Sequence, residues 1–166
     1  MIVISTFPGM GKTYFYNNFQ STLSSYDSDS SKFPKDNFPN NYIDHIKEKL
    51  KLNDRDIIFV SSHEDVRQAL IDNGINFTVV YPKKIDKEAM IQRYKERGSS
   101  PEFVRLLEEN YDNFIDSIEN MINENPEKVF GIELGANMYM SNYSIMDYIV
   151  KTNKNFFEQI GADNNA

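Results

Sequence analysis

The first thirteen residues constrain the fold more than any other stretch, because they join a buried strand to a glycine-rich turn. Met1 to Ile4 is a short apolar run with β-branched residues, the composition of a buried parallel strand. It leads into Phe7-Pro-Gly-Met-Gly-Lys-Thr13, and the residues from Tyr14 onward are typical of a helix. A strand that meets a helix through a loop ending in Gly-Lys-Thr is the context of a phosphate-binding loop, or P-loop.

The residue types in this loop suit a phosphorylated nucleotide. Gly9 and Gly11 allow backbone conformations that a Cβ atom would block, so that successive N–H groups can turn toward an anion. Lys12 would reach the β- and γ-phosphates of ATP, and the Thr13 hydroxyl would bind Mg²⁺. The full motif has a glycine five residues before its last glycine, where this chain has Thr6. The alternative is a turn that needs glycines and happens to contain a lysine. The expected ATP-binding residues are Pro8, Gly9, Met10, Gly11, Lys12, Thr13 and Tyr14.

Composition and charge exclude several classes of protein. At 166 residues the chain suits one domain with a sizeable core. It has no cysteine, which excludes disulfides and thiolate metal sites, and no apolar run approaches the roughly 20 residues of a membrane span. The net charge of −7 disfavours generic nucleic-acid binding. No basic-then-apolar leader precedes the first strand, so we expect a cytoplasmic protein.

Short apolar strands alternate with helical patterns along the rest of the chain. This alternation predicts an α/β fold of three layers, in which a five-stranded parallel sheet is covered by helices on both faces. The expected strands are residues 1–4, 22–26, 56–61, 76–81 and 128–133. The expected helices are residues 12–20, 40–51, 64–73, 86–97, 100–123 and 144–157, and residues 161–166 are expected to be a disordered tail.

Polar side chains follow the second and third predicted strands. Asp27 and Asp29 come after the second strand, and Ser61, Ser62 and His63 come after the third. Because the carboxyl ends of parallel strands form the ligand-binding edge of an open α/β sheet, these residues are candidates for a site. Each cluster also has a plainer interpretation, since Asp and Ser favour turns and His63 can cap the next helix.

With these residues the chain resembles the nucleoside monophosphate kinase and shikimate/gluconate kinase branch of P-loop proteins, and more narrowly small phage nucleotide-kinase-like proteins. The resemblance extends to about residue 135. Asp27-Ser-Asp29 resembles the Asp-x-Asp that coordinates Mg²⁺ and positions or deprotonates the acceptor hydroxyl in small-metabolite kinases. Arg93-Tyr-Lys-Glu-Arg97 resembles the Arg-x-x-x-Arg of the lid, whose arginines clamp the transferring phosphoryl group. The residues 135–140 correspond to the loop that holds adenine in this family, whereas Ser61 replaces an aspartate that many members carry.

The resemblance implies ATP- and Mg²⁺-dependent phosphoryl transfer to a small acceptor, and a (deoxy)nucleoside monophosphate is the acceptor expected first. A hydroxyl acceptor (a nucleoside, sugar, modified base or nucleic-acid 5′ end) is the nearest alternative, which the Asp-x-Asp favours while the arginines favour a phosphorylated acceptor. The second alternative is a non-catalytic nucleotide-binding regulator or inhibitor. The expected catalytic residues are Lys12, Asp29, Arg93 and Arg97, the substrate-binding residues Asp27, Asp29, Ser62 and Arg67, and the Mg²⁺ ligands Thr13 and Asp27.

The expected organisation is one P-loop kinase-like domain over residues 1–160. Within it, residues 28–52 would bind the acceptor and residues 86–105 would form the lid. The expected partner is a small nucleotide substrate, with no membrane and no nucleic acid, and the chain would act as a monomer or a homodimer. If the protein is phage-encoded, its compartment is the cytoplasm of the bacterial host.

Overall fold

The computed structural model describes residues 1–165 and confirms the predicted alternation of strands and helices. The strands are β1 (Ile2–Thr6), β2 (Ser25–Asp27), β3 (Ile57–Ser61), β4 (Phe77–Pro82) and β5 (Val129–Leu134). The helices are α1 (Lys12–Asn18), α2 (Asn40–Leu52), α3 (Glu64–Asp72), α4 (Lys87–Glu96), α5 (Pro101–Glu124) and α6 (Tyr143–Asn165). Short 3-10 turns cover Ser30–Lys32, Lys35–Asn37 and Lys84–Asp86.

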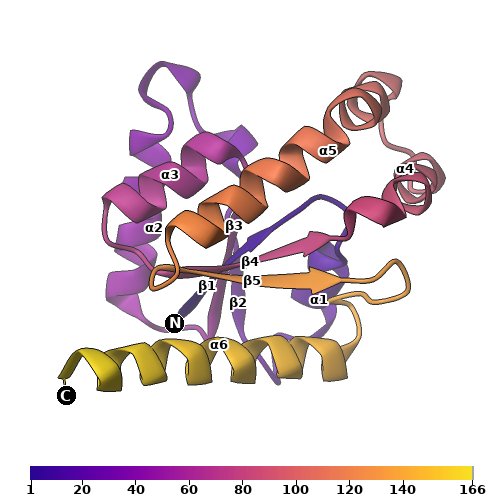
Figure 1. The fold of residues 1–166 in the computed structure, drawn as a ribbon. Coiled ribbons are helices and arrows are strands. Elements are labelled where there is room, and N and C mark those ends of the chain that lie inside the picture. The colour runs from indigo at the N-terminus through magenta and orange to yellow at the C-terminus, as the bar shows by residue number, and fades with distance from the viewer. Residues whose placement is uncertain (166) are drawn as a thin grey trace.

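The strands form one parallel sheet in the order β2-β3-β1-β4-β5. The central strand β1 pairs with β3 on one side and with β4 on the other, and its last residue, Thr6, pairs with Ser61 of β3. The loop after β1 leads to α1 on one face of the sheet, whereas the loops after β3 and β4 lead to helices on the opposite face (Figure 1). Ligands of open α/β sheets bind in the crevice that such a divergence opens at the carboxyl ends of the strands.

Helices cover both faces of the sheet, so the predicted three-layer fold is confirmed. In Figure 1, α6 lies beneath the sheet, α3 and α5 lie above it, and α2 lies at the left next to α3. On the α1 and α6 face, Phe15 of α1 packs edge-on against Phe59 of β3, with ring centroids 5.9 Å apart. On the same face, Phe130 of β5 stacks on Phe156 of α6 at 4.4 Å.

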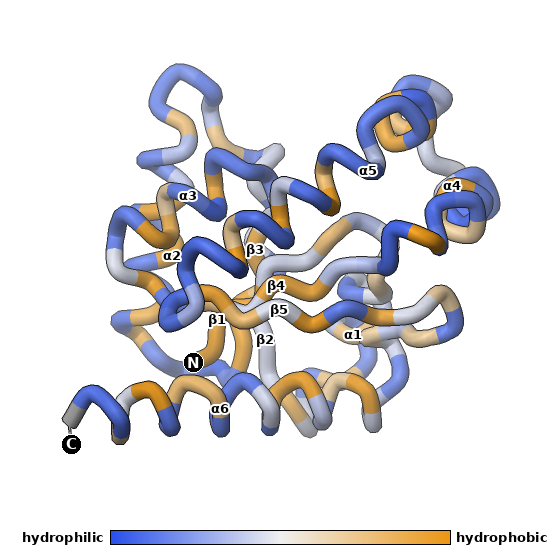
Figure 2. The backbone as a smooth tube through the Cα atoms, viewed as in Figure 1, coloured by the Kyte–Doolittle hydropathy of each residue, from blue (hydrophilic) through white to orange (hydrophobic). Residues whose placement is uncertain are grey.

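The core lies between the central strands and the helices on either side. Ile4, Phe59 and Phe77 are completely buried, and the tube in Figure 2 is mostly hydrophobic along β1 and β4. The helix α5 has an amphipathic pattern, and its residues Tyr111 and Ile115 face inward while the polar residues between them face solvent. Burying each such side chain contributes about 1.5–3 kcal/mol, which makes the sheet a rigid support for the loops at its carboxyl edge.

Two element boundaries differ from the prediction. The helix α1 ends at Asn18, because the Gln20 side chain turns back to accept a hydrogen bond from the Ser25 N–H at 2.9 Å and so starts β2. The last helix is longer than predicted: α6 continues to Asn165, so residues 161–165 are helical rather than a disordered tail. Gly161 lowers helix stability by only about 1 kcal/mol. The prediction for residue 166 lies outside the described residues. No helix within residues 1–165 is long and apolar enough to cross a membrane.

Candidate functional site

The glycine-rich loop follows β1 and turns directly into α1. Gly9 and Gly11 have φ values of 83° and 91°, in the left-handed region that glycine enters without strain. A Cβ atom on Gly9 would lie 2.7 Å from Cε1 of Tyr94, and one on Gly11 would lie 2.8 Å from the backbone nitrogen of Ser141. Both positions therefore need glycine for conformation and for space. Thr6, which replaces the first glycine of the motif, is the last residue of β1 and belongs to the sheet rather than to the loop.

The carbonyl groups of the loop are held from outside by two other segments. The Tyr94 hydroxyl of α4 donates to the Pro8 carbonyl at 2.7 Å, and the N–H of Met140, in the loop after β5, donates to the Met10 carbonyl at 2.8 Å. The N–H groups of residues 9–13, by contrast, donate to no protein acceptor within residues 1–165. The loop carbonyls thus accept hydrogen bonds from the protein, whereas the successive N–H groups of residues 9–13 remain available to donate to a bound anion.

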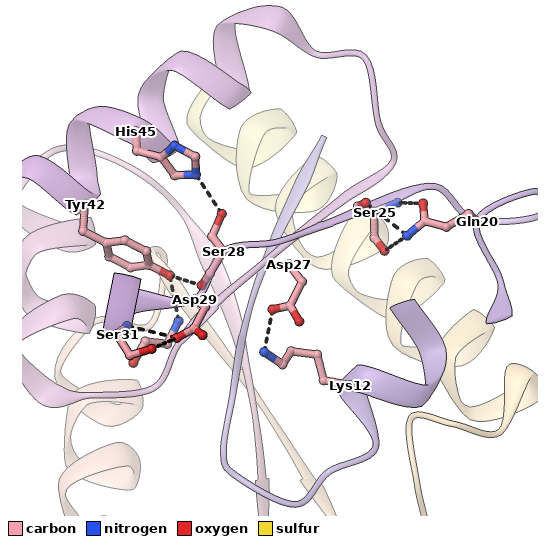
Figure 3. Close-up of polar contacts among 10 residues, drawn as sticks. Lys12, Gln20, Ser25, Asp27, Ser28, Asp29, Ser31, Tyr42 and His45 are labelled. Atoms are coloured by element: carbon pink, nitrogen blue, oxygen red, sulfur yellow. Dashed lines mark hydrogen bonds and ion pairs between the residues drawn. The ribbon is translucent and has the colours of Figure 1, made fainter. Parts of the chain in front are cut away.

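The Lys12 ammonium forms an ion pair with Asp27. Its Nζ lies 2.6 Å from Oδ1 of Asp27, and Figure 3 shows the two side chains reaching toward each other from the start of α1 and the end of β2. Both side chains are partly exposed to solvent, so the pair contributes little to stability. The predicted phosphate-binding lysine is therefore paired with the predicted metal-binding carboxylate, and a bound phosphate would compete for Lys12.

Asp29 caps the 3-10 turn of residues 30–32. One oxygen of its carboxylate accepts hydrogen bonds from the Ser31 hydroxyl at 2.7 Å and from the Ser31 N–H at 2.9 Å. These bonds, the hydroxyl first, hold the pKa of Asp29 below its usual value. Asp29 is therefore ionised at neutral pH and lies at the cavity as an oxygen acceptor. The carboxylate that caps the turn also lines the cavity, so this geometry is compatible with both the turn and the site interpretation of the segment.

The helix α2 fixes the segment between Asp27 and Asp29. The Tyr42 hydroxyl donates to the Ser28 carbonyl at 2.6 Å and accepts from the Ser61 N–H at 3.2 Å. His45 places Nε2 3.0 Å from the Ser28 hydroxyl (Figure 3), and burial lowers the pKa of His45. The Tyr42 contact ties the loops after β2 and β3 to one rigid helix. Tyr42 could not be identified from the sequence, because these two contacts depend on how α2 packs against segments distant in the sequence.

The two predicted lid arginines both line the cavity but in different states. The Arg93 guanidinium donates to the carbonyls of Gly9, at 2.7 Å, and Ala136, and lies 4.0 Å from the ring centre of Tyr139. Its Nε is buried without a hydrogen-bond partner in the described chain. Arg97 is exposed, and within the described chain it donates only to the Ser99 hydroxyl, at 2.9 Å. Its guanidinium also lies over the rings of Tyr94 and Phe103, 5.0 and 5.7 Å from their centres. Arg93 therefore joins the glycine-rich loop to the loop after β5, while Arg97 makes contacts within α4 and with the start of α5.

Arg67 is not brought to this cavity, in contrast to its predicted contact with the substrate. It is only 2% exposed and lies between α3 and α5. Its Nε donates to the Ser62 carbonyl at 2.9 Å, and one terminal nitrogen donates to the Ser117 hydroxyl at 2.9 Å. Arg67 is on the buried side of α3, next to Val66 and one turn before Leu70. From this position its long side chain reaches α5. Burial lowers the pKa of Arg67.

The predicted residues after the strands meet around one cavity of about 430 Å³, except Asp27, which does not line it and is connected to it through its ion pair with Lys12. This volume is within the usual range of small-molecule sites. The cavity is lined by residues 6–14, 28–30 and 60–63 together with Arg93, Arg97 and Tyr139. A second cavity of about 530 Å³ shares Ser30 and His63 with the first and is lined also by Ser31, Phe33, Lys35, Phe38 and Asp65. His63 is at the N-cap position of α3 but makes no side-chain capping bond.

The donors present suit Mg²⁺ only together with a phosphate. No group of three or more His, Cys, Asp or Glu side chains that could hold a metal ion is found in the described part of the chain. Thr13 and Asp27 supply one hydroxyl and one carboxylate, the hard oxygen donors that Mg²⁺ prefers, and Mg²⁺ is commonly held by one or two carboxylates with substrate phosphates and water. The pair therefore fits a Mg²⁺ ion that arrives with a nucleotide.

A parallel α/β sheet with a Gly-Lys-Thr loop between its central strand and the following helix defines a P-loop type of phosphate site. No protein-family model and no curated protein matches the sequence. Among solved structures, the chain is similar to a deoxyadenosine kinase from M. mycoides with bound dCTP, with 99% of each chain covered, 18% sequence identity and a TM-score of 0.44.

Proposed function

We propose that the protein transfers the γ-phosphoryl group of ATP to a small acceptor, with Mg²⁺. The observation that carries the proposal is the set of N–H groups of residues 9–13, which have no protein acceptor in the described chain and surround left-handed Gly9 and Gly11. Donors arranged in this way bind the phosphates of nucleotides. Lys12 extends from the same turn, so the cradle and its cation are in one short segment.

The residues of the loop would divide the work of binding ATP. On binding, Lys12 would leave Asp27 for the β- and γ-phosphates, and the freed Asp27 carboxylate would be available, with the Thr13 hydroxyl, to hold Mg²⁺. Mg²⁺, when bound there, would neutralise charge on the β- and γ-phosphates. Pro8, Met10 and Tyr14 complete the wall of the cavity, and residues 86–105 would act as the lid. Arg97 would clamp the transferring group, while Arg93 keeps the loop in its bound conformation.

The second cavity, in residues 28–52 and the start of α3, is where we expect the acceptor. Phe33 and Phe38 offer aromatic surface for a base, and Lys35 offers a cation for a phosphate. Ser62 and Asp29 both line the first cavity, from which Asp29 would orient the acceptor oxygen. A (deoxy)nucleoside monophosphate is the first candidate acceptor, since its phosphate could bind both Arg97 and Lys35.

A hydroxyl acceptor, such as a nucleoside or a sugar, is the second candidate. The position of Arg67 favours it, because one of the three arginines that would neutralise an acceptor phosphate is instead buried between α3 and α5. Arg93 is also occupied by two backbone carbonyls. An ionised Asp29 is suited to accept a hydrogen bond from an attacking hydroxyl.

The test is ADP release from ATP and Mg²⁺ with a panel of ribo- and deoxynucleoside monophosphates, nucleosides and a DNA 5′-hydroxyl end. We expect one class of acceptor to stimulate release, and Lys12→Ala to abolish both stimulation and ATP binding. If ATP binds but no acceptor stimulates turnover, phosphoryl transfer to these acceptors is refuted, and a nucleotide-binding regulator becomes the better proposal. If ATP does not bind at all, the phosphate-cradle interpretation itself fails.

A further inference from the structure

A third cavity, of about 140 Å³, lies between α3 and α5. Its walls are mostly apolar, and the residues that form them include Phe103, Leu106, Leu107, Phe114 and Ile118 of α5. An engineered protein cavity of about 150 Å³ lined by Leu, Ile and Phe binds benzene. The cavity between α3 and α5 therefore has the size and the lining for one aromatic ring.

The polar side of this cavity is formed by the buried Arg67 together with Ser62, His63, Ser117 and the exposed Glu64. Arg67 and Ser117 both line the cavity, and the hydrogen bond between them is 2.9 Å long. The other partners of the guanidinium are the Ser62 and Ser117 carbonyls and the Met121 sulfur, all of them uncharged. No carboxylate within residues 1–165 forms an ion pair with Arg67, although Glu64 acts on it at longer range.

An anion close to such a buried charge would stabilise it further. A guanidinium stays protonated in proteins, and a buried charge without a close counter-charge lowers stability. Arg67 is 2% exposed, so water screens it poorly. The cavity beside it supplies room for an anionic group close to Arg67, together with apolar walls for the rest of the molecule that carries it.

We propose that this cavity binds a small aromatic anion, with the ring among the α5 side chains and the anionic group toward Arg67. Leu106 is 49% exposed and Phe114 is 36% exposed, so a ligand can reach the apolar walls from solvent. The site is distinct from the acceptor cavity, with which it shares only His63. It shares Phe7, Pro8, Ser62 and His63 with the cavity of the glycine-rich loop, and the proposal does not depend on phosphoryl transfer.

The experiment compares benzoate with benzamide, which has the same shape and no charge. Titration of methyl-labelled protein, followed by NMR, reports directly on Leu107 and Ile118. We expect benzoate to shift the methyl signals of these two residues with a dissociation constant of about 1 mM. The affinity for benzamide should be at least about tenfold lower than the affinity for benzoate, since a charged hydrogen bond is roughly twice as strong as a neutral one.

Two sets of variants separate charge from packing. Arg67→Met should abolish the preference for benzoate over benzamide. Because Arg67→Met also removes buried hydrogen bonds, a second pair of variants changes only the half-exposed Leu106. Leu106→Glu should weaken benzoate binding about fivefold relative to Leu106→Gln, because the introduced carboxylate repels the carboxylate of benzoate. Both Leu106 variants alter a half-exposed side chain and should fold as the parent does.

Three results would overturn the proposal. The first is the absence of methyl shifts at Leu107 and Ile118 at benzoate concentrations of about 10 mM, roughly ten times the expected dissociation constant. The second is equal affinity for benzoate and benzamide in the parent protein. The third is benzoate-induced shifts confined to residues 9–13, which would place the anion in the glycine-rich loop instead.

Discussion

Replacing Gly11 by alanine tests the packing of the loop after β5 on the glycine-rich loop. An alanine at φ 91° would be in the left-handed region, which costs an L-residue about 1–2 kcal/mol. Its Cβ would also lie 2.8 Å from the backbone nitrogen of Ser141 and 3.3 Å from that of Met140. Side-chain rotation cannot relieve contacts with backbone, so the loop after β5 must move.

The cost of that movement follows from the contact it breaks. The N–H of Met140 donates to the Met10 carbonyl at 2.8 Å, and losing such a hydrogen bond costs about 1 kcal/mol. We therefore expect Gly11→Ala to lower the free energy of unfolding by about 2–3 kcal/mol in total. Gly74 is the matched control, because its φ is 69° and no atom lies within 4 Å of its Cβ position. Gly74→Ala should cost only the conformational part, about 1–2 kcal/mol.

Urea unfolding of the parent and the two variants measures both values, provided that the three m-values agree. The reasoning predicts a larger loss for Gly11→Ala than for Gly74→Ala, with a difference of about 1–2 kcal/mol. Equal losses, within about 0.5 kcal/mol, would refute the close approach of the two loops. The Gly11 variant should also bind ATP more weakly, whereas the Gly74 variant should bind it as the parent does.

The remaining predictions concern four single side chains. Arg97→Ala should lower turnover about a hundredfold or more without changing ATP affinity, and loss of ATP binding in this variant would contradict the prediction. Arg93→Ala should instead lower the unfolding free energy, measured with urea, by about 2 kcal/mol, because two carbonyls lose their donor. Tyr94→Phe should cost about 1 kcal/mol in urea unfolding, since the hydroxyl bonds the Pro8 carbonyl, and an unchanged stability would mean that this bond is not formed in solution. Burial lowers the pKa of His45 below its ordinary 6.5, so near this pH the unfolded chain binds more protons than the folded chain. The free energy of unfolding should therefore fall as the pH drops below about 6.5, and this part of the pH dependence should disappear in His45→Gln.

The elements of the fold could be predicted because their signals are local. The glycines of the loop, the apolar run of β3 and the cap at Ser100, whose side chain accepts from the Phe103 N–H, depend on residues near in sequence. The order of the strands is a different matter, because β1 pairs with β3 and β4 through residues more than fifty positions away. The end of α6 was placed too early, at residue 157, because Gly161 and the polar residues after it are typical of a chain end, whereas the helix continues through them to Asn165.

For the candidate site, the positions of the residues could be predicted from the sequence, but their partners could not. The sequence by itself determined that Lys12, Thr13, Asp27 and Asp29 would gather at one edge of the sheet, because parallel strands end on the same side and each of these residues follows a strand directly or through the glycine-rich loop. Only the tertiary structure decided which partner each charged side chain meets. A long arginine can reach in several directions, and whether it contacts a ligand or a distant carbonyl depends on how helices pack. That is why Arg67 lies against α5 rather than at the glycine-rich loop.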